Sequence, residues 1–156
     1  MSEARDQSFM QLALAEAQAA AEAGEVPVGA VIVDPVTDAV IAAAGNAPIA
    51  GHDPTAHAEI RAIRLAAEKL GNYRLSGLEL FVTLEPCAMC AGAISFARIG
   101  RLVYGAPDQK GGAVENGPRF FEQPTCHWSP ELQSRIEADA SASLLKAFFK
   151  ARRGDK

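Results

Sequence analysis

The combination of Pro-Cys-Ala-Met-Cys at positions 86–90 with an earlier His-Ala-Glu at 57–59 constrains this chain more than any other feature of its sequence. Two cysteines three residues apart at the start of a helix can bind one metal ion from a single face, and a histidine that opens another helix can add a third ligand. Three such ligands leave one coordination position open, as in catalytic zinc sites, whereas structural sites are closed by four. The motif therefore predicts a zinc site formed by His57, Cys87 and Cys90.

Glu59 follows the predicted ligand His57 by two residues, which places a carboxyl group beside the open position. A carboxylate there can accept a proton from water and pass it to a leaving amine. Two thiolates neutralise the dication and acidify bound water less than three histidines would, but the helix N-termini at both ligand groups favour thiolate and hydroxide. We therefore expect Glu59 to be the catalytic residue and not a ligand.

Two other interpretations of the cysteines remain open. A cysteine pair alone fits a core filler or a redox pair, but the upstream histidine and glutamate favour zinc. A fourth ligand from Cys126 or His127 would close the site and make it structural, which would leave Glu59 without a role. Cys126 is better explained as a buried thiol.

The remaining sequence alternates between strand and helix patterns, as expected for one α/β domain spanning residues 1–156. Apolar runs predict strands at 28–33, 39–45, 78–84 and 101–104, and helices are expected at 8–23, 54–70 and from 86 onwards. Residues 106–130 read as a loop. The last helix begins either at 130 or near 138, because 132–136 could instead form a short edge strand. This order predicts a sheet with helices on both faces.

In the helix expected from Pro54 onwards, the 100° spacing of residues predicts a buried stripe. That stripe consists of Ile60, Ile63, Ala67 and Leu70. His57 and Glu59 lie at its two edges, so both side chains can lean inward.

Composition limits the class of protein. A net charge of −4 and a pI near 5.4 argue against a general nucleic-acid binder, although they allow a local basic patch. The one candidate patch is the carboxyl-terminal group Lys146, Lys150, Arg152, Arg153 and Lys156, which could equally be a solvated helix end. The amino terminus lacks a secretory h-region, no apolar run is long enough to span a membrane, and three cysteines do not make a disulfide framework. We expect a cytoplasmic protein that does not bind membranes.

His-x-Glu followed by Pro-Cys-x-x-Cys is the signature of zinc nucleobase deaminases. Within the zinc-dependent cytidine/deoxycytidylate deaminase superfamily, the chain resembles the bacterial tRNA-specific adenosine deaminases, the TadA family. The resemblance covers roughly residues 9–153 and rests on five blocks of sequence. These are Glu-Val-Pro-Val-Gly-Ala-Val at 25–31, Gly-Asn-Ala-Pro at 45–48, His-Asp-Pro-Thr-Ala-His-Ala-Glu-Ile at 52–60, Thr-Leu-Glu-Pro-Cys-Ala-Met-Cys-Ala-Gly-Ala at 83–93 and Arg-Leu-Val-Tyr-Gly-Ala at 101–106.

The resemblance implies a three-layer α/β/α cytidine-deaminase-like fold with a mixed sheet of about five strands, in a homodimer with the site near the interface. It implies one Zn²⁺ per subunit on His57, Cys87 and Cys90. The implied reaction converts adenosine to inosine at the wobble position of a tRNA anticodon. Zinc-bound hydroxide attacks C6, and Glu59 shuttles protons to the leaving ammonia.

The resemblance also implies the substrate contacts. Asn46 would touch the edge of the flipped base, the backbone around Val28 would line the pocket, and an anticodon stem-loop is a suitable partner because its bases are already single-stranded. The residues that would approach the RNA are Asp108, Lys110, Phe149, Arg152 and Arg153. Pro107 and the segment 120–128 depart from the family pattern, and both are expected on the side that meets RNA.

Two other functions compete with this one. A deaminase of free bases or nucleosides, of guanine or cytosine type, would use the same scaffold and depend little on salt. A zinc-stabilised RNA-binding module without catalysis would keep RNA binding and have no activity to lose when Glu59 is replaced. The sequence does not specify which tRNA or flanking bases are preferred.

Overall fold

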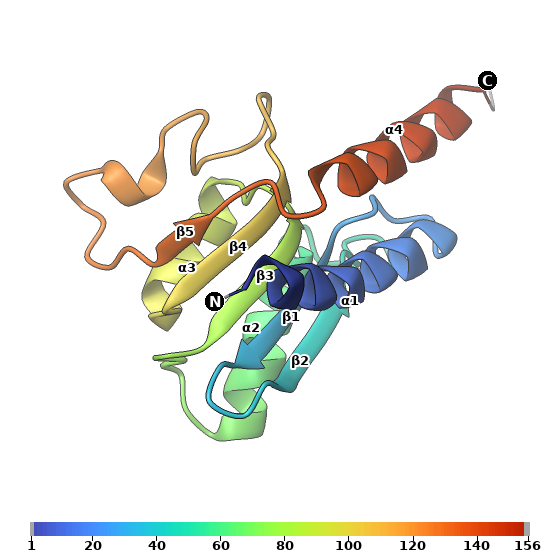
Figure 1. The fold of residues 1–156 in the computed structure, drawn as a ribbon. Coiled ribbons are helices and arrows are strands. Elements are labelled where there is room, and N and C mark those ends of the chain that lie inside the picture. Colours follow the sequence, from blue (N-terminus) through green and yellow to red (C-terminus); the bar gives the residue numbers. More distant parts are fainter. Residues whose placement is uncertain (1, 155–156) are drawn as a thin grey trace.

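The computed structural model describes residues 2–154 and contains five strands and four α-helices (Figure 1). The strands are β1 (Gly29–Asp34), β2 (Ala39–Gly45), β3 (Glu79–Leu84), β4 (Arg101–Ala106) and β5 (Glu131–Gln133). The helices are α1 (Glu3–Glu22), α2 (Ala58–Leu70), α3 (Ala88–Ala97), α4 (Ala138–Gly154) and the short 3₁₀ helix η1 (Phe120–Glu122).

The strands form one mixed sheet in the order β2-β1-β3-β4-β5. Strand β1 pairs antiparallel with both β2 and β3, while β3, β4 and β5 run parallel. Helices α2 and α3 cover one face and α1 the other, and α4 projects from the sheet edge where β3 and β4 end (Figure 1). The predicted three-layer α/β/α fold with a five-stranded mixed sheet is confirmed.

The central strands are buried on both faces, as their unbroken apolar runs predict. In β1, Ile32 packs in the cluster beneath α2 and α3, whereas Val31 and Val33 pack with Met10 and Phe81 beneath α1. The sheet is therefore fixed between two apolar layers, and its strand ends are held in a defined position.

Helix α2 differs from the expectation in its start and its buried face. It begins at Ala58 with His57 as the N-cap residue, not at Pro54. Leu70, expected in the buried stripe, is 47% exposed, while Ala62 and Ala66 are fully buried. Ile60 is buried as predicted, and Ile63 and Ala67 pack against the core, so the buried face includes the two small alanines and excludes Leu70.

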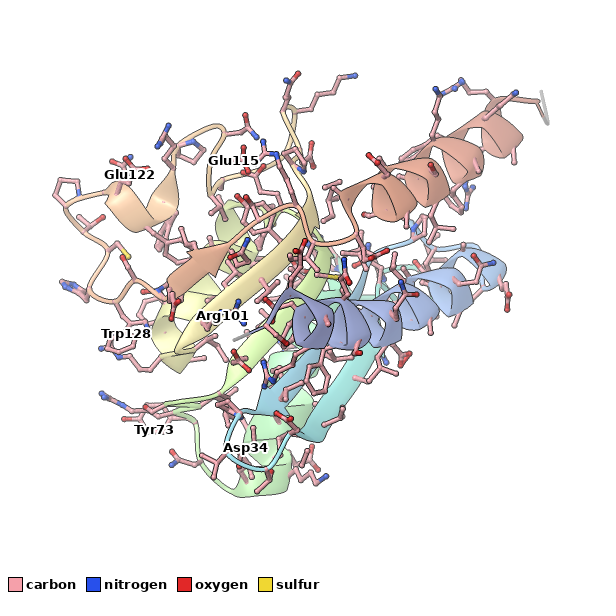
Figure 2. The ribbon with its side chains drawn as sticks, viewed as in Figure 1. Asp34, Tyr73, Arg101, Glu115, Glu122 and Trp128 are labelled. Atoms are coloured by element: carbon pink, nitrogen blue, oxygen red, sulfur yellow. The ribbon has the colours of Figure 1, made fainter. Side chains whose placement is uncertain are left out.

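The segment after β4 resolves the alternatives left open at the carboxyl end. Residues 131–133 form the edge strand β5, and α4 begins only at Ala138. Trp128 anchors the preceding loop by donating from Nε1 to the carbonyl of Ile99 at 2.8 Å (Figure 2). Lys156 of the predicted basic group lies outside the described residues. Among residues 2–154, no helix combines the length and the apolar character that a membrane crossing requires.

Candidate metal centre and pocket

Two helix N-termini meet at the edge of the sheet where strand β3 ends. His57 is the N-cap residue of α2 and Cys87 is the N-cap residue of α3, and Cys90 lies in the first turn of α3. The positive ends of both helix dipoles therefore point at the same place, where they favour thiolates and other anions.

The three donor atoms are spaced as one metal ion requires. Nδ1 of His57 lies 3.6 Å from Sγ of Cys87 and 3.5 Å from Sγ of Cys90. A tetrahedral zinc with bonds of about 2.3 Å to sulfur and about 2.05 Å to nitrogen would hold its ligand atoms about 3.6 Å apart. Within residues 2–154, these side chains form the one group of three or more metal-binding types close enough to share an ion. The site fits zinc in both donor chemistry and spacing.

The two sulfurs are strongly coupled. The neighbouring Cys90 stabilises the thiolate of Cys87 and lowers the pKa of Cys87 to about 5. The same contact, together with burial, raises the pKa of Cys90. A pair that shares its charge in this way readily yields a proton to a metal ion, since thiolates are the ligands.

Glu59 is a buried carboxyl group beside the donor atoms. Its residue is 4% exposed, in the first turn of α2. Burial raises the pKa of Glu59 to about 7, with a further contribution from the negative charge of Cys87. A carboxyl group that titrates near neutral pH can both accept and donate protons there.

A pocket of about 290 Å³ opens over this group of side chains. Of the residues predicted from the sequence, it is lined by Val28, Asn46, His57, Glu59, Cys87 and Asp108. Cys90 lies behind this wall and is fully buried. Chain segments far apart in sequence thus meet at one hollow. They bring together the predicted metal ligands, the predicted catalytic residue Glu59, and the residues predicted to contact the nucleobase.

Asn46 has a structural contact that sequence reasoning missed. Its Oδ1 accepts the main-chain N–H of Ala58 at 2.8 Å and so caps the first turn of α2. Because the side-chain oxygen is used in this way, the amide NH₂ is the group that remains to contact a ligand in the pocket.

The residues expected to approach RNA lie outside this pocket, apart from Asp108. Lys110 and Phe149 line an adjoining hollow of about 560 Å³, which also includes Asp108. Arg152 and Arg153 are exposed in the last turn of α4 and line neither hollow. Arg152 donates to the carbonyl of Gly24, and its guanidinium lies over the ring of Phe148.

The contacts of segment 120–128 show what it packs against, while its expected place on the side that meets RNA stays a prediction. The thiol of Cys126 lies 3.7 Å from Oγ of Ser95, and Trp128 bonds to Ile99. This segment therefore packs against the carboxyl-terminal half of α3, away from the pocket. Neither Cys126 nor His127 belongs to the group of metal-binding side chains found among residues 2–154, and Cys126 is only partly buried.

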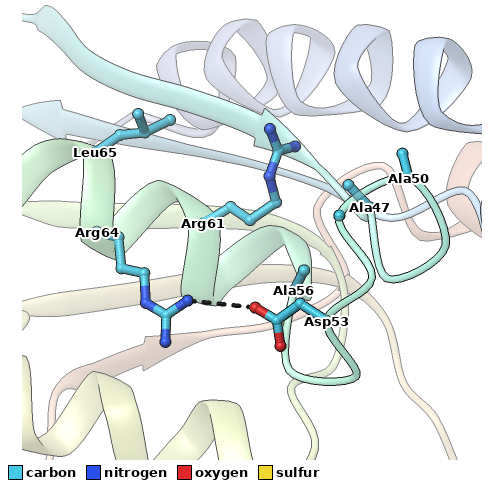
Figure 3. Close-up of a pocket in the computed structure, with 8 residues that line it drawn as sticks. Ala47, Ala50, Asp53, Ala56, Arg61, Arg64 and Leu65 are labelled. Atoms are coloured by element: carbon cyan, nitrogen blue, oxygen red, sulfur yellow. Dashed lines mark ion pairs between the residues drawn. The ribbon is translucent and has the colours of Figure 1, made fainter.

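A separate hollow of about 470 Å³ lies between α2 and the loop that precedes it (Figure 3). Arg61 reaches from α2 to the carbonyl of Gly45 at 2.6 Å, and Arg64 pairs with Asp53 at 3.5 Å. None of the predicted metal ligands lines this hollow, and its charged side chains Asp53, Arg61 and Arg64 already have protein partners. The chemistry therefore belongs to the smaller pocket.

Glu85 lines the pocket and was missed as a site residue. Burial by itself raises the pKa of its carboxyl group, but N–H donors on Asp108, Asn116 and Val114 outweigh burial and hold the pKa below its usual value. The available sequence signal was a charged residue between an apolar strand and the first metal-binding cysteine.

The chain matches the model for the cytidine and deoxycytidylate deaminase zinc-binding region over residues 3–106. It is 57% identical to the tRNA-specific adenosine deaminase of Agrobacterium fabrum over 147 residues, which is 94% of this chain and 95% of that protein.

Two solved structures show the same fold. One, from work on A-to-I editing by tRNA:A34 deaminases at the wobble position of transfer RNA, has a TM-score of 0.86 and 58% identity, covering 88% of this chain and 99% of that one. The other, a guanine deaminase from Nitrosomonas europaea, has a TM-score of 0.80 and 25% identity, covering 91% of this chain and 83% of that one.

Proposed function

Since the chain belongs to the zinc-binding cytidine and deoxycytidylate deaminase family, together with the tRNA-specific adenosine deaminases, we propose that it hydrolyses adenosine to inosine at the wobble position of a tRNA anticodon. The net reaction consumes one water and releases one ammonia. The observation that carries the proposal is the buried carboxyl group of Glu59 beside the donor atoms of His57, Cys87 and Cys90 in one pocket.

We assign one zinc ion per subunit to His57, Cys87 and Cys90. Zinc held there would supply Lewis-acid activation of a water molecule near neutral pH. The protein's part is to hold the three donors within 4.8 Å of one another at two helix N-termini, whose dipoles stabilise the thiolates. Three donors from these helices leave room for a fourth, non-protein ligand facing the pocket.

Glu59 moves the protons. Its carboxylate accepts a proton from the attacking water, and the resulting carboxylic acid returns it to the amino group that leaves C6 as ammonia. Burial in α2 keeps its side chain away from bulk water and raises the pKa of its carboxyl group, which favours its taking up a proton.

The adenine base would enter the pocket after leaving its stack. Val28 supplies an apolar wall and Asn46 offers its amide NH₂ to an acceptor on the base edge. Taking a base out of a stack costs a few kcal/mol, and least in a loop that is already single-stranded, which favours an anticodon loop as substrate.

The surrounding surface would bind the RNA backbone and flanking bases. Lys110 and Phe149 face the adjoining hollow, where an ammonium group and an exposed ring suit a phosphate and a neighbouring base. Asp108 forms the boundary between the two hollows. Arg152 and Arg153 extend this surface along α4 with positive charge.

We also propose that the protein is a cytoplasmic homodimer. Helices α2 and α3, which cover the same face of the sheet, expose large apolar side chains outward, with Phe96 80% exposed and Leu65, Leu70 and Met89 partly so. Apolar side chains gathered on one face suit a subunit interface. Sedimentation at micromolar concentration would give a dimer mass if this face is the interface. Three free cysteines suit a reducing compartment.

A second candidate is deamination of a free purine base, favoured by the likeness to the guanine deaminase. The discriminating experiment incubates the zinc-loaded protein with tRNA transcripts that carry A34 and, separately, with free adenosine, guanine and cytosine. We expect inosine only at position 34, with rates that fall as salt rises. Glu59→Ala should retain zinc and RNA binding without product. Turnover of free guanine with the tRNA untouched would overturn the proposal.

A further inference from the structure

Glu85 is a buried carboxylate for which the proposed chemistry has no use. It directly follows the last residue of β3, two residues before Cys87, and is 2% exposed. It lines the same pocket as Glu59 but is neither a metal donor nor the proton carrier.

Both oxygens of Glu85 are used by a single loop, residues 107–117. Oε1 accepts the main-chain N–H of Asp108 at 2.8 Å and the side-chain amide of Asn116 at 2.7 Å. Oε2 accepts three successive main-chain N–H groups, from Val114 at 3.0 Å, Glu115 at 2.9 Å and Asn116 at 3.0 Å. Four main-chain N–H groups and one side-chain amide thus surround one carboxylate, and bonds to a charged acceptor are stronger than neutral ones.

At Gly112 the backbone of the loop lies closer to Glu85 than a residue with a Cβ atom would allow. A Cβ on Gly112 would lie 2.4 Å from Cδ of Glu85 and 2.5 Å from the carbonyl of Asp108. The N–H of Gly112 bonds to that same carbonyl at 2.9 Å. The loop is thus wrapped around the carboxylate, with glycine at the point of closest contact.

This loop forms the part of the pocket wall that faces the proposed RNA. Asp108 and Gly111 line the pocket, and Asp108 and Lys110 line the adjoining hollow opposite Phe149. The donor atoms and Glu59 lie on α2 and α3 instead. Displacing the loop would change the opening through which a base enters and leave the reacting groups in place.

We propose that Glu85 is a positioning residue for the RNA substrate, because its carboxylate fixes the 107–117 loop in the shape that admits the flipped base and its flanking nucleotides. The assignment of RNA as the ligand rests on the proposed function, whereas the control of the loop does not. Its effect falls on substrate binding and not on proton transfer.

Glu85→Gln tests this, because an amide presents a donor where every partner is itself a donor. We expect KM for the tRNA transcript to rise on the order of tenfold, with kcat changed less than about threefold. Zinc content should be unchanged, and the amides of residues 114–116 should exchange with deuterium faster. Glu79→Gln is the matched control, since it makes the same change in a carboxylate that is also 2% exposed, at the other end of β3. It should lower stability without moving KM or the exchange of 114–116.

Gly112→Ala displaces the loop while leaving the Glu85 carboxylate intact, and it should reproduce the rise in KM even if Glu85→Gln fails to fold. The proposal is overturned if neither variant raises KM beyond the Glu79→Gln control. It is equally overturned if exchange at 114–116 is the same in the Glu85 and Glu79 variants. Because exchange needs no substrate, it decides the role of Glu85 in the loop even if the protein fails to deaminate tRNA.

Discussion

The guanidinium of Arg101, labelled in Figure 2, forms a bidentate ion pair with the carboxylate of Asp6, with N–O distances of 2.8 and 2.7 Å, and both side chains are buried. The same guanidinium donates to Glu79 at 3.0 Å. One side chain at the start of β4 therefore joins the amino-terminal helix to the neighbouring strand, at the end of the sheet remote from the metal centre.

Arg101→Met should lower the free energy of unfolding by about 3–5 kcal/mol, because it leaves Asp6 without its buried partner. Arg119→Met makes the same change in the pair with Glu122, where both side chains are more than half exposed, and should cost about 0–1 kcal/mol. Urea denaturation at neutral pH measures both. Equal losses in the two variants would show that the buried network does not join the helix to the sheet as described.

Cys90→Ala should abolish zinc binding, because it removes a fully buried donor. Cys126→Ser is the matched control, since that thiol contacts Ser95 and not the donor group, and it should leave one zinc per chain. Metal analysis after dialysis against a weak chelator measures both variants. Loss of zinc in the Cys126 variant would instead support a structural zinc site that Cys126 closes as a fourth ligand.

Much of the fold was predictable because the strands β1, β3 and β4 are continuous apolar runs bounded by turn residues. The buried face of α2 was predictable only in part, because periodicity identified Ile60 but gave weight to Leu70, while the helix also packs on the sheet through Ala62 and Ala66.

The same limit applies to the site. The metal ligands His57, Cys87 and Cys90 could be predicted from short sequence motifs, because each one precedes a helix or lies in its first turn. The partners of Glu85 lie 23 to 31 residues further along the chain and meet it only after the loop has folded back. No local pattern indicates that contact.

Asn46 offers two functions that two substitutions can separate. Asn46→Asp keeps the oxygen that accepts the N–H of Ala58, so the start of α2 should remain capped and the melting temperature nearly unchanged. It loses the amide NH₂ proposed to contact the base, so kcat/KM should fall on the order of a hundredfold. Asn46→Ala should lose both activity and about 1 kcal/mol of stability. Full activity in the aspartate variant would remove the base contact from Asn46.

The cations of α4 should contribute to RNA affinity through phosphate contacts. Replacing Lys150, Arg152 and Arg153 together with alanine should weaken binding of an anticodon stem-loop, and it should reduce the slope of log K against log salt by about two, because three counterion-releasing contacts are lost. Lys69→Ala with Arg74→Ala removes charge near the remote end of α2 and should change neither quantity. Fluorescence anisotropy, recorded at salt concentrations from about 50 to about 300 mM, measures the affinity of both variants and its dependence on salt. An unchanged slope in the triple variant would mean that these residues only complement the dipole of the last helix.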